Sequence, residues 1–467
     1  MISTTYGFQS SNTISLTGAI SYWPPVYVNV KTSNTVGSNA LSLGFQLSWD
    51  AELAQFPTSP EYKQLASDAG FKMIRFFSHI LDPCSHWNES TNTGTFSWTN
   101  VDNVVRSILE IGAEPFITLG FCDHDGIIIP KGMATDPATL LPHPEDFSAY
   151  CKEWVKHFKQ LALPVRYYEI INEPYFYYYS NWNYNETKLG YYLTLFNTCY
   201  NVMHDENPQI LIGSDSSLYR KFLDYWVMHN GRLDFLSFHK YDSYGPSESD
   251  SSGIQRAETQ YLVSNSLIYG VKDAQQKWFN ATGTTLPAIN SESNWSAYAT
   301  NGTDPRLQQV LGAVWTALTL RNCMLNNVQY SVYYAFASSK SWELLKGVGY
   351  GFGMVNSDDK KPWYPYFVQK MIGQNLKVGD SIVESTSSSN DLRSIAWVHN
   401  NTLNILLVCK TDQPRTVSLQ GISGQLNISR IANTIPYTTP SVQTDVIGST
   451  QSLITDGYEV ILLQGLL

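Results

Sequence analysis

Two glutamates stand where a pair of carboxyl groups could carry out acid–base and nucleophilic chemistry. Glu173 follows the apolar and aromatic run 165–171 within an Asn-Glu-Pro tripeptide, and Glu292 ends the run 286–292. Burial and mutual repulsion keep one carboxyl of such a pair protonated while the other stays ionised. Cleavage of a glycosidic bond with retention of configuration requires two carboxyl groups roughly 5–5.5 Å apart. The sequence therefore predicts Glu173 as an acid/base and Glu292 as a nucleophile of one site.

Four further polar residues are predicted to support this pair. Asn172 directly precedes the acid and can bond a sugar 2-hydroxyl, a contact that strengthens in the transition state. His239 and Tyr241 alternate at the end of the run 233–241, where Tyr241 could donate to Glu292 and keep it ionised. Arg75, near the end of the run 71–77, supplies a fixed positive charge.

The elements that must position these residues are eight short apolar runs separated by amphipathic segments. The runs are 40–49, 71–77, 113–121, 165–171, 209–215, 233–241, 286–292 and 328–337. This alternation predicts parallel βα units closed into a (β/α)8 TIM barrel, the α/β fold class. An open doubly wound sheet would usually carry a Gly-rich phosphate loop after its first strand, and the residues after 40–49 contain none. Strands four and seven lie across a barrel from each other, so Glu173 and Glu292 should face one another at its mouth.

The pattern changes after the barrel. Residues 378–467 show strand-like alternation with Ser, Thr and Gly turns, which predicts an accessory C-terminal β-sandwich. We expect the N-terminal β segment 1–39 to join this sandwich, and the catalytic barrel to occupy 40–377. The sandwich is interpreted as a stabilising companion of the barrel, with carbohydrate binding as the alternative.

Composition narrows the classes of partner. The chain has 467 residues, a formal net charge of −10 and only 15% charged residues. A nucleic-acid or anionic-membrane partner would lack its electrostatic attraction, and no run approaches the roughly 18 apolar residues of a membrane span. We expect a carbohydrate substrate, no nucleic acid and no membrane insertion. The oligomeric state is left open.

Several features are consistent with secretion. The residues MISTTYGFQSS lack the charged and apolar regions typical of a signal peptide, so we expect either a cytoplasmic protein or a mature extracellular form with an added Met, and we favour the second. The six cysteines are core thiols by default, but secretion would pair some of them, and Cys84–Cys122 and Cys151–Cys199 are the candidate disulfides. Glycosylation sequons occur at Asn88, Asn185, Asn280, Asn294, Asn301, Asn400 and Asn427.

The motifs together resemble the clan A glycoside hydrolases, the four-seven superfamily. They are Asn-Glu-Pro on strand four, Glu on strand seven and His-x-Tyr on strand six. Within this clan, the stretches DFLSFHKYD (234–242) and GYGFGMVNSDDKKPWYPYFVQKM (349–371) resemble glycoside hydrolase family 39. The resemblance implies a barrel with a β-sandwich built from both chain ends, and retaining hydrolysis without metal or organic cofactor. It also implies the residue roles given above.

The sequence departs from this family at the sugar platform. Ser293, Asn294 and Trp295 follow the nucleophile where family 39 often has Trp-Asn, and strand eight carries Tyr334 and Ser338 where Trp and Asp are frequent. These departures weaken any transfer of the family's xyloside or iduronide specificity to this chain.

Aromatic residues near the predicted mouth are candidates for sugar subsites. The loop 175–184, YFYYYSNWNY, follows the acid, and its rings could stack on sugars or simply pack. The individual candidates for substrate contact are Trp182, Trp295, Trp342, His79 and Trp49.

The sequence as a whole predicts a secreted retaining β-glycosidase that acts on an oligo- or polysaccharide. A family 5-like endo-β-glucanase or mannanase, with the same machinery, is the nearer alternative. A non-catalytic carbohydrate-binding protein on a barrel scaffold is the alternative from another class. Exo or endo action and the identity of the sugar are left open.

Overall fold

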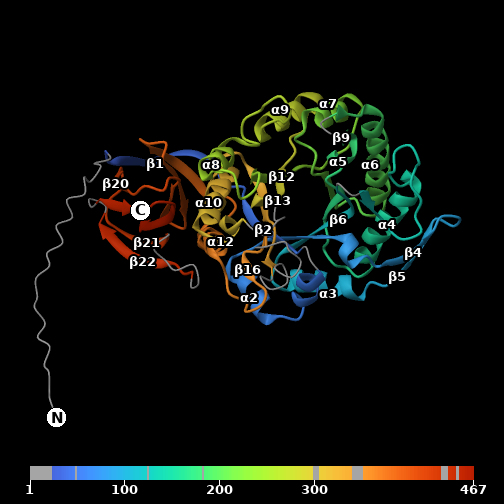
Figure 1. Cartoon of the computed structure of the whole chain (residues 1–467), viewed down its shortest axis with the longest axis horizontal. Helices are drawn as coiled ribbons and strands as arrows, with labels where there is room; N and C mark the ends of the chain where they lie inside the picture. Colours follow the sequence, from blue (N-terminus) through green and yellow to red (C-terminus); the bar gives the residue numbers. More distant parts are fainter. Residues whose placement is uncertain are drawn as a thin grey trace, which may run out of the picture.

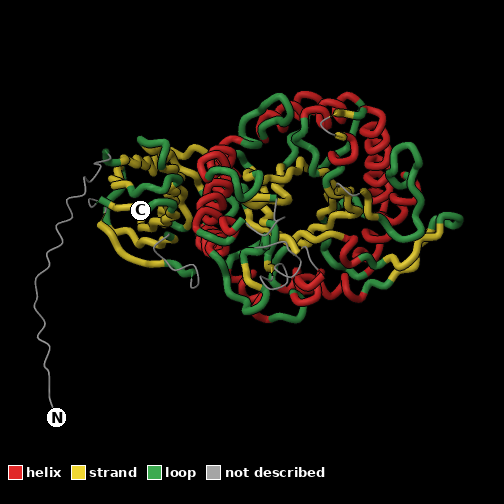
Figure 2. The backbone as a smooth tube through the Cα atoms, in the orientation of Figure 1, coloured by secondary structure: helices red, strands yellow, loops and turns green. Residues whose placement is uncertain are grey.

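The computed structural model contains a helix-covered barrel and a separate β-sheet domain that carries the C-terminus (Figure 1). It describes residues 24–47, 50–123, 126–180, 183–297, 304–338, 351–432, 440–448 and 452–467. Helices surround the strands of the barrel, whereas the C-terminal domain is drawn as strands and loops alone (Figure 2).

Eight parallel strands close into the barrel. Their hydrogen-bonded order is β3-β2-β14-β13-β12-β11-β8-β6, and pairing of β3 with β6 completes the ring. The strands are β2 (Ser42–Leu47), β3 (Met73–Phe77), β6 (Glu114–Asp123), β8 (Tyr167–Asn172), β11 (Leu211–Ser214), β12 (Phe235–Ser243), β13 (Ala288–Ser296) and β14 (Val328–Tyr333). Each corresponds to one of the eight predicted runs, which confirms the (β/α)8 prediction.

The helices lie around this ring. They are α1 (Asp50–Gln55), α2 (Pro60–Asp68), α3 (Thr99–Glu110), α4 (Pro144–Gln160), α5 (Tyr175–Tyr178), α6 (Glu186–Glu206), α7 (Arg220–Met228), α8 (Asp250–Thr259), α9 (Val271–Thr282), α10 (Val310–Leu325) and α12 (Tyr364–Asn375), with the 3-10 turns η1 (Ser78–Leu81) and η2 (Pro305–Leu307). Nearly every residue of α10 is buried, because this helix packs on the barrel and on the C-terminal sheet.

Short strands decorate the loops of the barrel. They are β4 (Cys84–Asn88), β5 (Thr93–Phe96), β7 (Gly126–Ile128), β9 (Tyr179–Ser180), β10 (Asn183–Tyr184), β15 (Ala337–Ser338) and β16 (Val355–Asn356). Of these, β7 extends the barrel sheet as a hairpin on β6, and the others form two-stranded ribbons.

The interior of the barrel is layered because alternate strand residues point inward. An apolar layer contains Met73, Phe116, Tyr167, Phe235, Ile289, Tyr330 and Val332. Two residues further along five of these strands lies a polar layer of Arg75, Thr118, Glu169, Ser237 and Ser291. The strand ends, which hold the candidate site, lie above the polar layer. The apolar layer thus seals the barrel below the chemistry.

The second domain is a single nine-stranded sheet. Its strands, in spatial order, are β22 (Gln443–Gly448), β21 (Gln425–Ile431), β24 (Glu459–Leu466), β19 (Thr402–Cys409), β18 (Leu392–His399), β17 (Ser381–Ser387), β1 (Val26–Ser38), β20 (Arg415–Gln420) and β23 (Leu453–Thr455). Apolar residues from all nine strands meet in one core, so the sheet folds over itself as the two layers of a sandwich do. β1, from the N-terminal part of the chain, pairs with β17 and β20 in the middle of this order.

The two domains share a packed and bonded interface. The indole of Trp397, in β18, is fully buried and donates to the carbonyl of Asn375 at the end of α12, over 2.7 Å. Glu258, in α8, pairs with both Arg393 and Lys410 of the sheet. These contacts fix the sheet against the outer side of α8, α10 and α12.

The structure corrects the disulfide predictions. All six cysteines are buried free thiols, so neither Cys84–Cys122 nor Cys151–Cys199 is a disulfide here. Cys151 and Cys199 do interact across α4 and α6, and burial together with Cys199 raises the pKa of the Cys151 thiol. The sequon at Asn294 is fully buried in β13 and does not present its amide for glycosylation.

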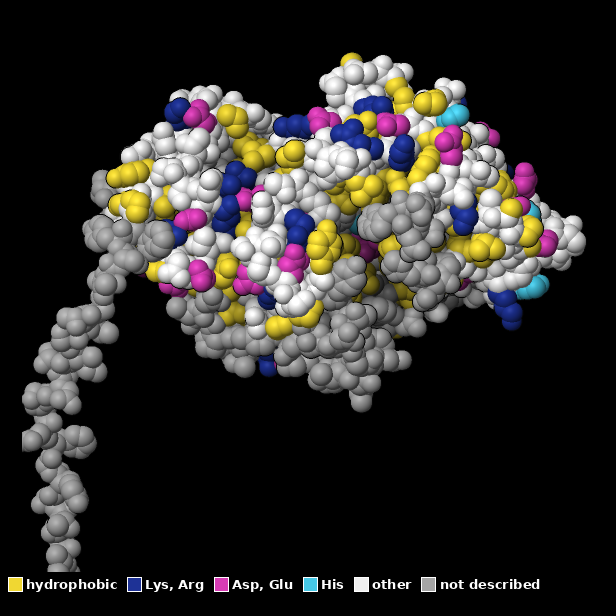
Figure 3. Space-filling view, turned by 45° about the horizontal axis from the view of Figure 1, so that its top comes forward, with side chains coloured by type: hydrophobic (Ala, Val, Ile, Leu, Met, Phe, Trp, Pro, Cys, Tyr) yellow, Lys and Arg dark blue, Asp and Glu magenta, His cyan; other side chains and the backbone are white. Residues whose placement is uncertain are grey.

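Charged side chains of both signs are interspersed with neutral ones on the face shown in Figure 3, and neither sign dominates it. Within the described ranges, no helix combines the length and the apolar character needed to cross a bilayer.

The position of β1 inside the C-terminal sheet can be tested by mutation. Val28 in β1 is 0% exposed, whereas Val36 in the same strand is 55% exposed. We expect Val28→Ala to lower the free energy of unfolding by about 2–3 kcal/mol, because it leaves a cavity in the core of the sheet. Urea unfolding would measure the change. Val36→Ala is the matched control, and equal losses for both variants would contradict the placement of β1.

Candidate active site

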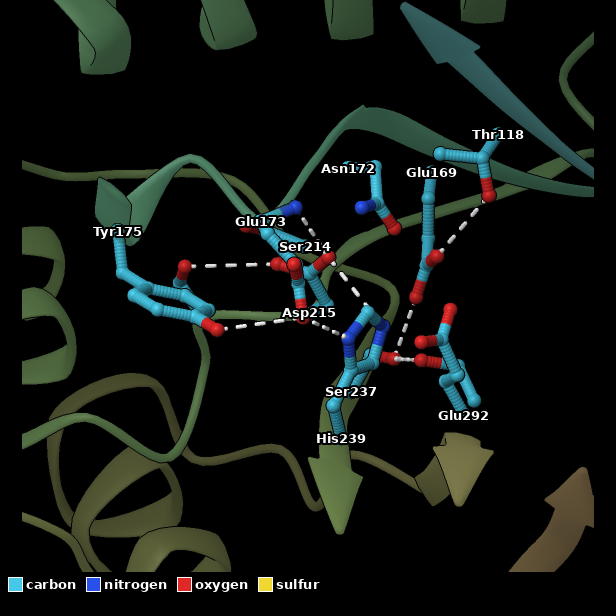
Figure 4. Close-up of polar contacts among 12 residues, drawn as sticks. Thr118, Glu169, Asn172, Glu173, Tyr175, Ser214, Asp215, Ser237, His239 and Glu292 are labelled. Carbon is cyan, nitrogen blue, oxygen red and sulfur yellow. Dashed lines mark hydrogen bonds and ion pairs between the residues drawn. The ribbon is translucent and has the colours of Figure 1, made fainter. Parts of the chain in front are cut away.

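Glu173 and Glu292 meet at the C-terminal ends of the barrel strands. Glu173 follows β8, Glu292 lies in β13, and His239 lies between them on β12 (Figure 4). One carboxylate oxygen of each glutamate and a ring nitrogen of His239 all lie within 4.8 Å of one another. The Glu292 residue is 7% exposed, and the Glu173 side chain is 17% exposed. The site is therefore a close pair of carboxyl groups of which one is reachable from solvent.

Arg75 occupies the centre of the site and is fully buried. Its Nε and Nη2 both donate to Glu169 Oε2, at 3.0 and 2.8 Å. Its Nη1 donates to Gln46 Oε1 at 2.6 Å and to Glu292 Oε2 at 2.7 Å. Its Nη2 also donates to Asn172 Oδ1 at 2.8 Å. One side chain thus fixes groups from β2, β8 and β13.

Glu169 is the buried counter-ion of Arg75. Its carboxylate also accepts from Thr118 Oγ1 at 3.2 Å and from the hydroxyl of Ser237. Burial works against its ionisation, but Arg75, His239 and the Ser237 hydroxyl outweigh burial and hold the pKa of Glu169 below its usual value. The carboxylate therefore stays charged in the interior of the barrel.

Glu292 receives a hydrogen bond on each oxygen. The Tyr241 hydroxyl donates to Oε1 at 2.5 Å, and Arg75 donates to Oε2. Burial, and next the charge of Glu292, raise the pKa of Tyr241 well above its usual value, so the phenol remains a donor. A register shift in the pairing of β12 with β13 places an extra residue, Ser291, before Glu292. Ser291 bonds Ser237 inside the barrel at 2.7 Å, and the bulge lets the next residue face inward as well.

Glu173 is held by its backbone and by its side chain. Ile171 and Glu173 have positive φ angles of 61° and 48°, a region that non-glycine residues seldom occupy. The Glu173 N–H donates to Asp215 Oδ2 at 2.6 Å, which secures this conformation. On the side chain, Oε1 accepts from the Tyr175 hydroxyl at 3.2 Å and lies 2.8 Å from His239 Nδ1.

His239 and Asp215 titrate away from their usual values. Burial opposes a charged imidazole, but Glu292, Asp215 and Glu173 outweigh it and raise the pKa of His239 to about 9. For Asp215, burial is the largest effect; His239 opposes it, Glu169 and Glu173 add to it, and the pKa rises to about 7. The His239 Nε2 atom lies 3.4 Å from Asp215 Oδ2. The site is thus built to hold protons near neutral pH.

Two groups of side chains could in principle hold a metal ion. They are Glu169, Asp215 and His239, and Glu173, His239 and Glu292. Arg75 bonds a carboxylate in each group and would repel a cation, and a protonated His239 has no lone pair to offer. The donor set therefore suits proton chemistry better than metal binding.

Most of the predicted polar site residues come together. The residues that meet around Arg75 are Asn172, Glu173, His239, Tyr241 and Glu292. His79 lies in η1 as a half-buried ring, 4.4 Å from the ring centroid of Phe121. Trp49, Trp182 and Trp342 lie outside the described residues.

The structure corrects the prediction for Trp295. This indole is 0% exposed, donates to Asp304 Oδ2 at 2.8 Å, and lies under the Arg306 guanidinium. A Cβ on Gly253, in α8, would meet its ring at 2.3 Å. Trp295 therefore packs on the outer side of β13 and does not line a sugar subsite.

Tyr334, which stands where family 39 often has Trp, lies near Tyr241, the hydrogen-bond partner of Glu292. Its ring centroid lies 6.5 Å from that of Tyr241 and 5.0 Å from that of Phe352. Asn294, two residues after Glu292, donates to the backbone carbonyls of Tyr334 and Phe352. The two departures from the family pattern thus contact each other.

The sequence analysis missed Glu169, Asp215 and Gln46. Glu169 is a charged residue inside a run of buried strand residues, which is itself a signal of an internal ion pair. Asp215 ends the predicted strand 209–215, and the rule that functional groups sit at strand ends could have singled it out. Gln46 gave no signal, because a glutamine near a strand end is common.

Comparisons with known proteins bear on the family and the fold of the chain. The family model of glycosyl hydrolases family 39 matches residues 28–418. A curated β-xylosidase from Caldicellulosiruptor saccharolyticus is 23% identical over 247 residues, which cover 49% of this chain and 46% of that relative, less than half its length. A monomeric β-xylosidase from Caulobacter crescentus CB15 matches with a TM-score of 0.66 and 15% identity over 94% of this chain and 99% of its own. The α-L-arabinofuranosidase from Thermotoga maritima matches with a TM-score of 0.63 and 12% identity over 95% of this chain and 100% of its own. These structural matches show a shared fold.

The dependence of the fold on the buried Arg75–Glu169 pair can be measured. We expect Glu169→Gln to lower the free energy of unfolding at pH 7 by about 3 kcal/mol or more, because it leaves a buried cation short of one partner. The pKa of Glu169 is lowered in the folded protein, so its contribution is present above the ordinary value and is lost as the pH falls through the folded value. The difference between variant and wild type should therefore shrink in acid.

A surface pair provides the control for this experiment. Glu114, in β6, and Arg166, which directly precedes β8, form the same kind of ion pair, with side chains 28% and 46% exposed. Glu114→Gln should cost less than about 1 kcal/mol, because solvent screens the pair. If urea unfolding gave similar losses of unfolding free energy for the two variants, the buried Arg75–Glu169 pair would contribute no more to stability than a surface pair does.

Proposed function

Because the chain belongs to glycosyl hydrolases family 39, we propose that it hydrolyses β-glycosidic bonds of an oligo- or polysaccharide with retention of configuration. The spacing of the two carboxyl groups carries this proposal. Oxygens of Glu173 and Glu292 approach within 4.8 Å, near the roughly 5–5.5 Å of retaining sites and well below the 6.5–9.5 Å of inverting ones. The pair leaves room for direct attack on the sugar and none for a water between carboxylate and sugar.

Glu292 is the proposed nucleophile. Its two oxygens are bonded by Tyr241 and Arg75, which favour the ionised form. In the first step, one of these oxygens forms a bond to the anomeric carbon while the bond from that carbon to the glycosidic oxygen breaks. The product is a glycosyl ester on Glu292. In the second step water attacks the same carbon, and Glu292 leaves as a carboxylate.

Glu173 is the proposed acid/base. It gives its proton to the departing oxygen in the first step and takes a proton from the attacking water in the second. Both of its side-chain contacts, with Tyr175 and His239, engage Oε1. Among the described residues no hydrogen bond engages Oε2, so this oxygen is the one we assign to proton transfer.

Asn172 is proposed to bind the 2-hydroxyl of the sugar. Its Oδ1 accepts from Arg75, which fixes the orientation of the amide and leaves the Nδ2 hydrogens as the donors offered to substrate. The contact would strengthen as positive charge develops on the sugar ring.

The intact pair argues against the alternative of a non-catalytic binding protein, since a binding role alone would not require two carboxyl groups with oxygens within 4.8 Å of each other. Because the family model that matches is that of family 39, we do not retain the family 5-like alternative. The similar proteins are named for xylosides and arabinofuranosides, so an aryl β-xyloside is the first substrate to try.

The assignment is tested by kinetics on a panel of aryl β-glycosides and β-linked polysaccharides. We expect Glu292→Ala to lower kcat by about 10⁴-fold or more, because the covalent step is lost. We expect Glu173→Ala to lose about 10²–10⁴-fold on substrates with poor leaving groups. Glu110→Ala, in which a surface glutamate whose side chain is 63% exposed is replaced, is the control.

Product analysis distinguishes the roles. Azide should rescue Glu173→Ala and yield a β-glycosyl azide, because azide replaces water on the glycosyl ester without needing a base. ¹H NMR of the wild-type reaction should show the β-anomer as the first product. Activity that survives Glu292→Ala would overturn the nucleophile, and an α-anomer as first product would overturn retention.

A further inference from the structure

Asp215 touches the proposed acid/base from two directions. It follows β11, is 3% exposed, and accepts the backbone N–H of Glu173 on Oδ2 at 2.6 Å. The same oxygen lies 3.4 Å from His239 Nε2, and the other ring nitrogen, Nδ1, lies 2.8 Å from Glu173 Oε1. Asp215, His239 and Glu173 thus form a chain of three groups that ends on the proton donor (Figure 4).

We propose that Asp215 is a positioning residue which, through His239, sets the pH range in which Glu173 can protonate the glycosidic oxygen. The inference rests on the proposed function and adds to it a residue outside the carboxylate pair. Asp215 does not contact the substrate in this scheme. It acts on the imidazole and on the backbone of Glu173.

The geometry favours a doubly protonated imidazole. Among the described residues, the ring makes its one hydrogen bond through Nδ1, to Glu173, and Nε2 faces the Asp215 carboxylate as an ion-pair contact at 3.4 Å. A neutral ring that donates through Nδ1 would turn the lone pair of Nε2 toward this carboxylate, whereas an imidazolium turns an N–H and a positive charge toward it. The ring is buried, with His239 7% exposed, so water cannot supply the missing partner easily. The raised pKa of His239, about 9, agrees with this arrangement.

The charged and titratable groups around Asp215, His239 and Glu173 decide how the protons of these three residues respond to a change at Asp215. The groups that face Asp215 and His239 from neighbouring elements are Arg75, Glu169, Glu292, Tyr175, Tyr178, Tyr192, Tyr219 and Tyr241. Among them Arg75 is the one cation, and it is bonded to Glu169 and Glu292. Removing the negative charge of Asp215 therefore lowers the proton affinity of the His239–Glu173 pair.

The protons balance through the reaction. In the first step the Glu173 proton passes to the departing oxygen, and the carboxylate left behind is met at once by the His239 N–H. Asp215 stabilises the imidazolium during this step. In the second step Glu173 takes a proton from water, and His239 keeps both of its ring protons.

Asp215→Asn tests the proposal, because the amide oxygen can still accept the Glu173 N–H while the charge is lost. The substrate is the aryl glycoside of whichever sugar the wild type cleaves. We expect the alkaline limb of kcat/KM to move to lower pH by about one unit. With a weakly acidic leaving phenol, kcat/KM should fall by about 10–100-fold, and with a dinitrophenol, which departs without a proton, by less than about threefold.

The chain offers a matched control at the opposite end of the barrel. Asp234, which precedes β12, accepts the backbone N–H of Ile212 at 2.8 Å and pairs with His204 Nε2 at 2.9 Å. It repeats the aspartate, histidine and backbone arrangement away from the site. Asp234→Asn should leave unchanged both the alkaline limb of kcat/KM and the dependence of kcat/KM on the leaving group.

An NMR titration of His239 tests the proposal without requiring enzymatic turnover. In protein with ¹⁵N-labelled histidine, the His239 ring signals can be assigned by their loss in His239→Gln. The midpoint of their titration should fall in Asp215→Asn and stay in place in Asp234→Asn. An unchanged midpoint, an unmoved alkaline limb, or equal losses with both leaving groups would overturn the role of Asp215. An inactive wild type would instead overturn the proposed function, and the NMR titration would still decide the proposal.

Discussion

The burial of one guanidinium at the centre of the barrel is the constraint on which the site depends. Taking an arginine out of water costs several kcal/mol unless its donors are bonded and its charge is met. Arg75 has five N–H groups, and each finds an acceptor on Glu169, Gln46, Glu292 or Asn172. The proposed nucleophile and the proposed 2-hydroxyl ligand are therefore held by the same side chain that the fold must satisfy. Stability and site geometry share one set of bonds.

The cluster contains more carboxyl groups than cationic groups, and the proton chemistry of the site originates in this imbalance. Two cationic groups, Arg75 and His239, face Glu169, Glu173, Asp215 and Glu292 in a small volume. An enclosure of low polarity disfavours the excess of negative charge, so protons are bound there instead. Glu169 lies against Arg75 and stays ionised, whereas the pKa of Asp215, which lies against His239 alone, rises to about 7. Position relative to Arg75 thus separates Glu169, which keeps its charge, from Asp215, which can hold a proton near neutral pH.

The sequence predicted the parts of this site that follow from strand periodicity, and missed those that depend on breaks in it. Apolar runs placed all eight strands, and the rule of strand ends placed Glu173 and Glu292 at one mouth. The same alternation could have excluded Trp295, which stands three residues after Glu292 and therefore faces outward. The positive φ angles at Ile171 and Glu173 and the bulge at Ser291 have no sequence signature, since no glycine marks them. Those irregularities accompany the inward placement of Asn172, Glu173 and Glu292, and the positive φ of Glu173 goes together with the bond from its N–H to Asp215.

The layered interior explains why such an unfavourable cluster of charges can persist. Phe116, Tyr167 and Phe235 fill the barrel directly below Thr118, Glu169 and Ser237, two residues earlier on each strand. The aromatic layer excludes water from beneath the charges, which strengthens every hydrogen bond above it. It also leaves the ion pairs no route to solvent on that side, so they can relax only toward the open mouth, where Glu173 is half-buried. The fold thus leaves Glu173, the proposed proton donor, on the side from which a sugar would enter.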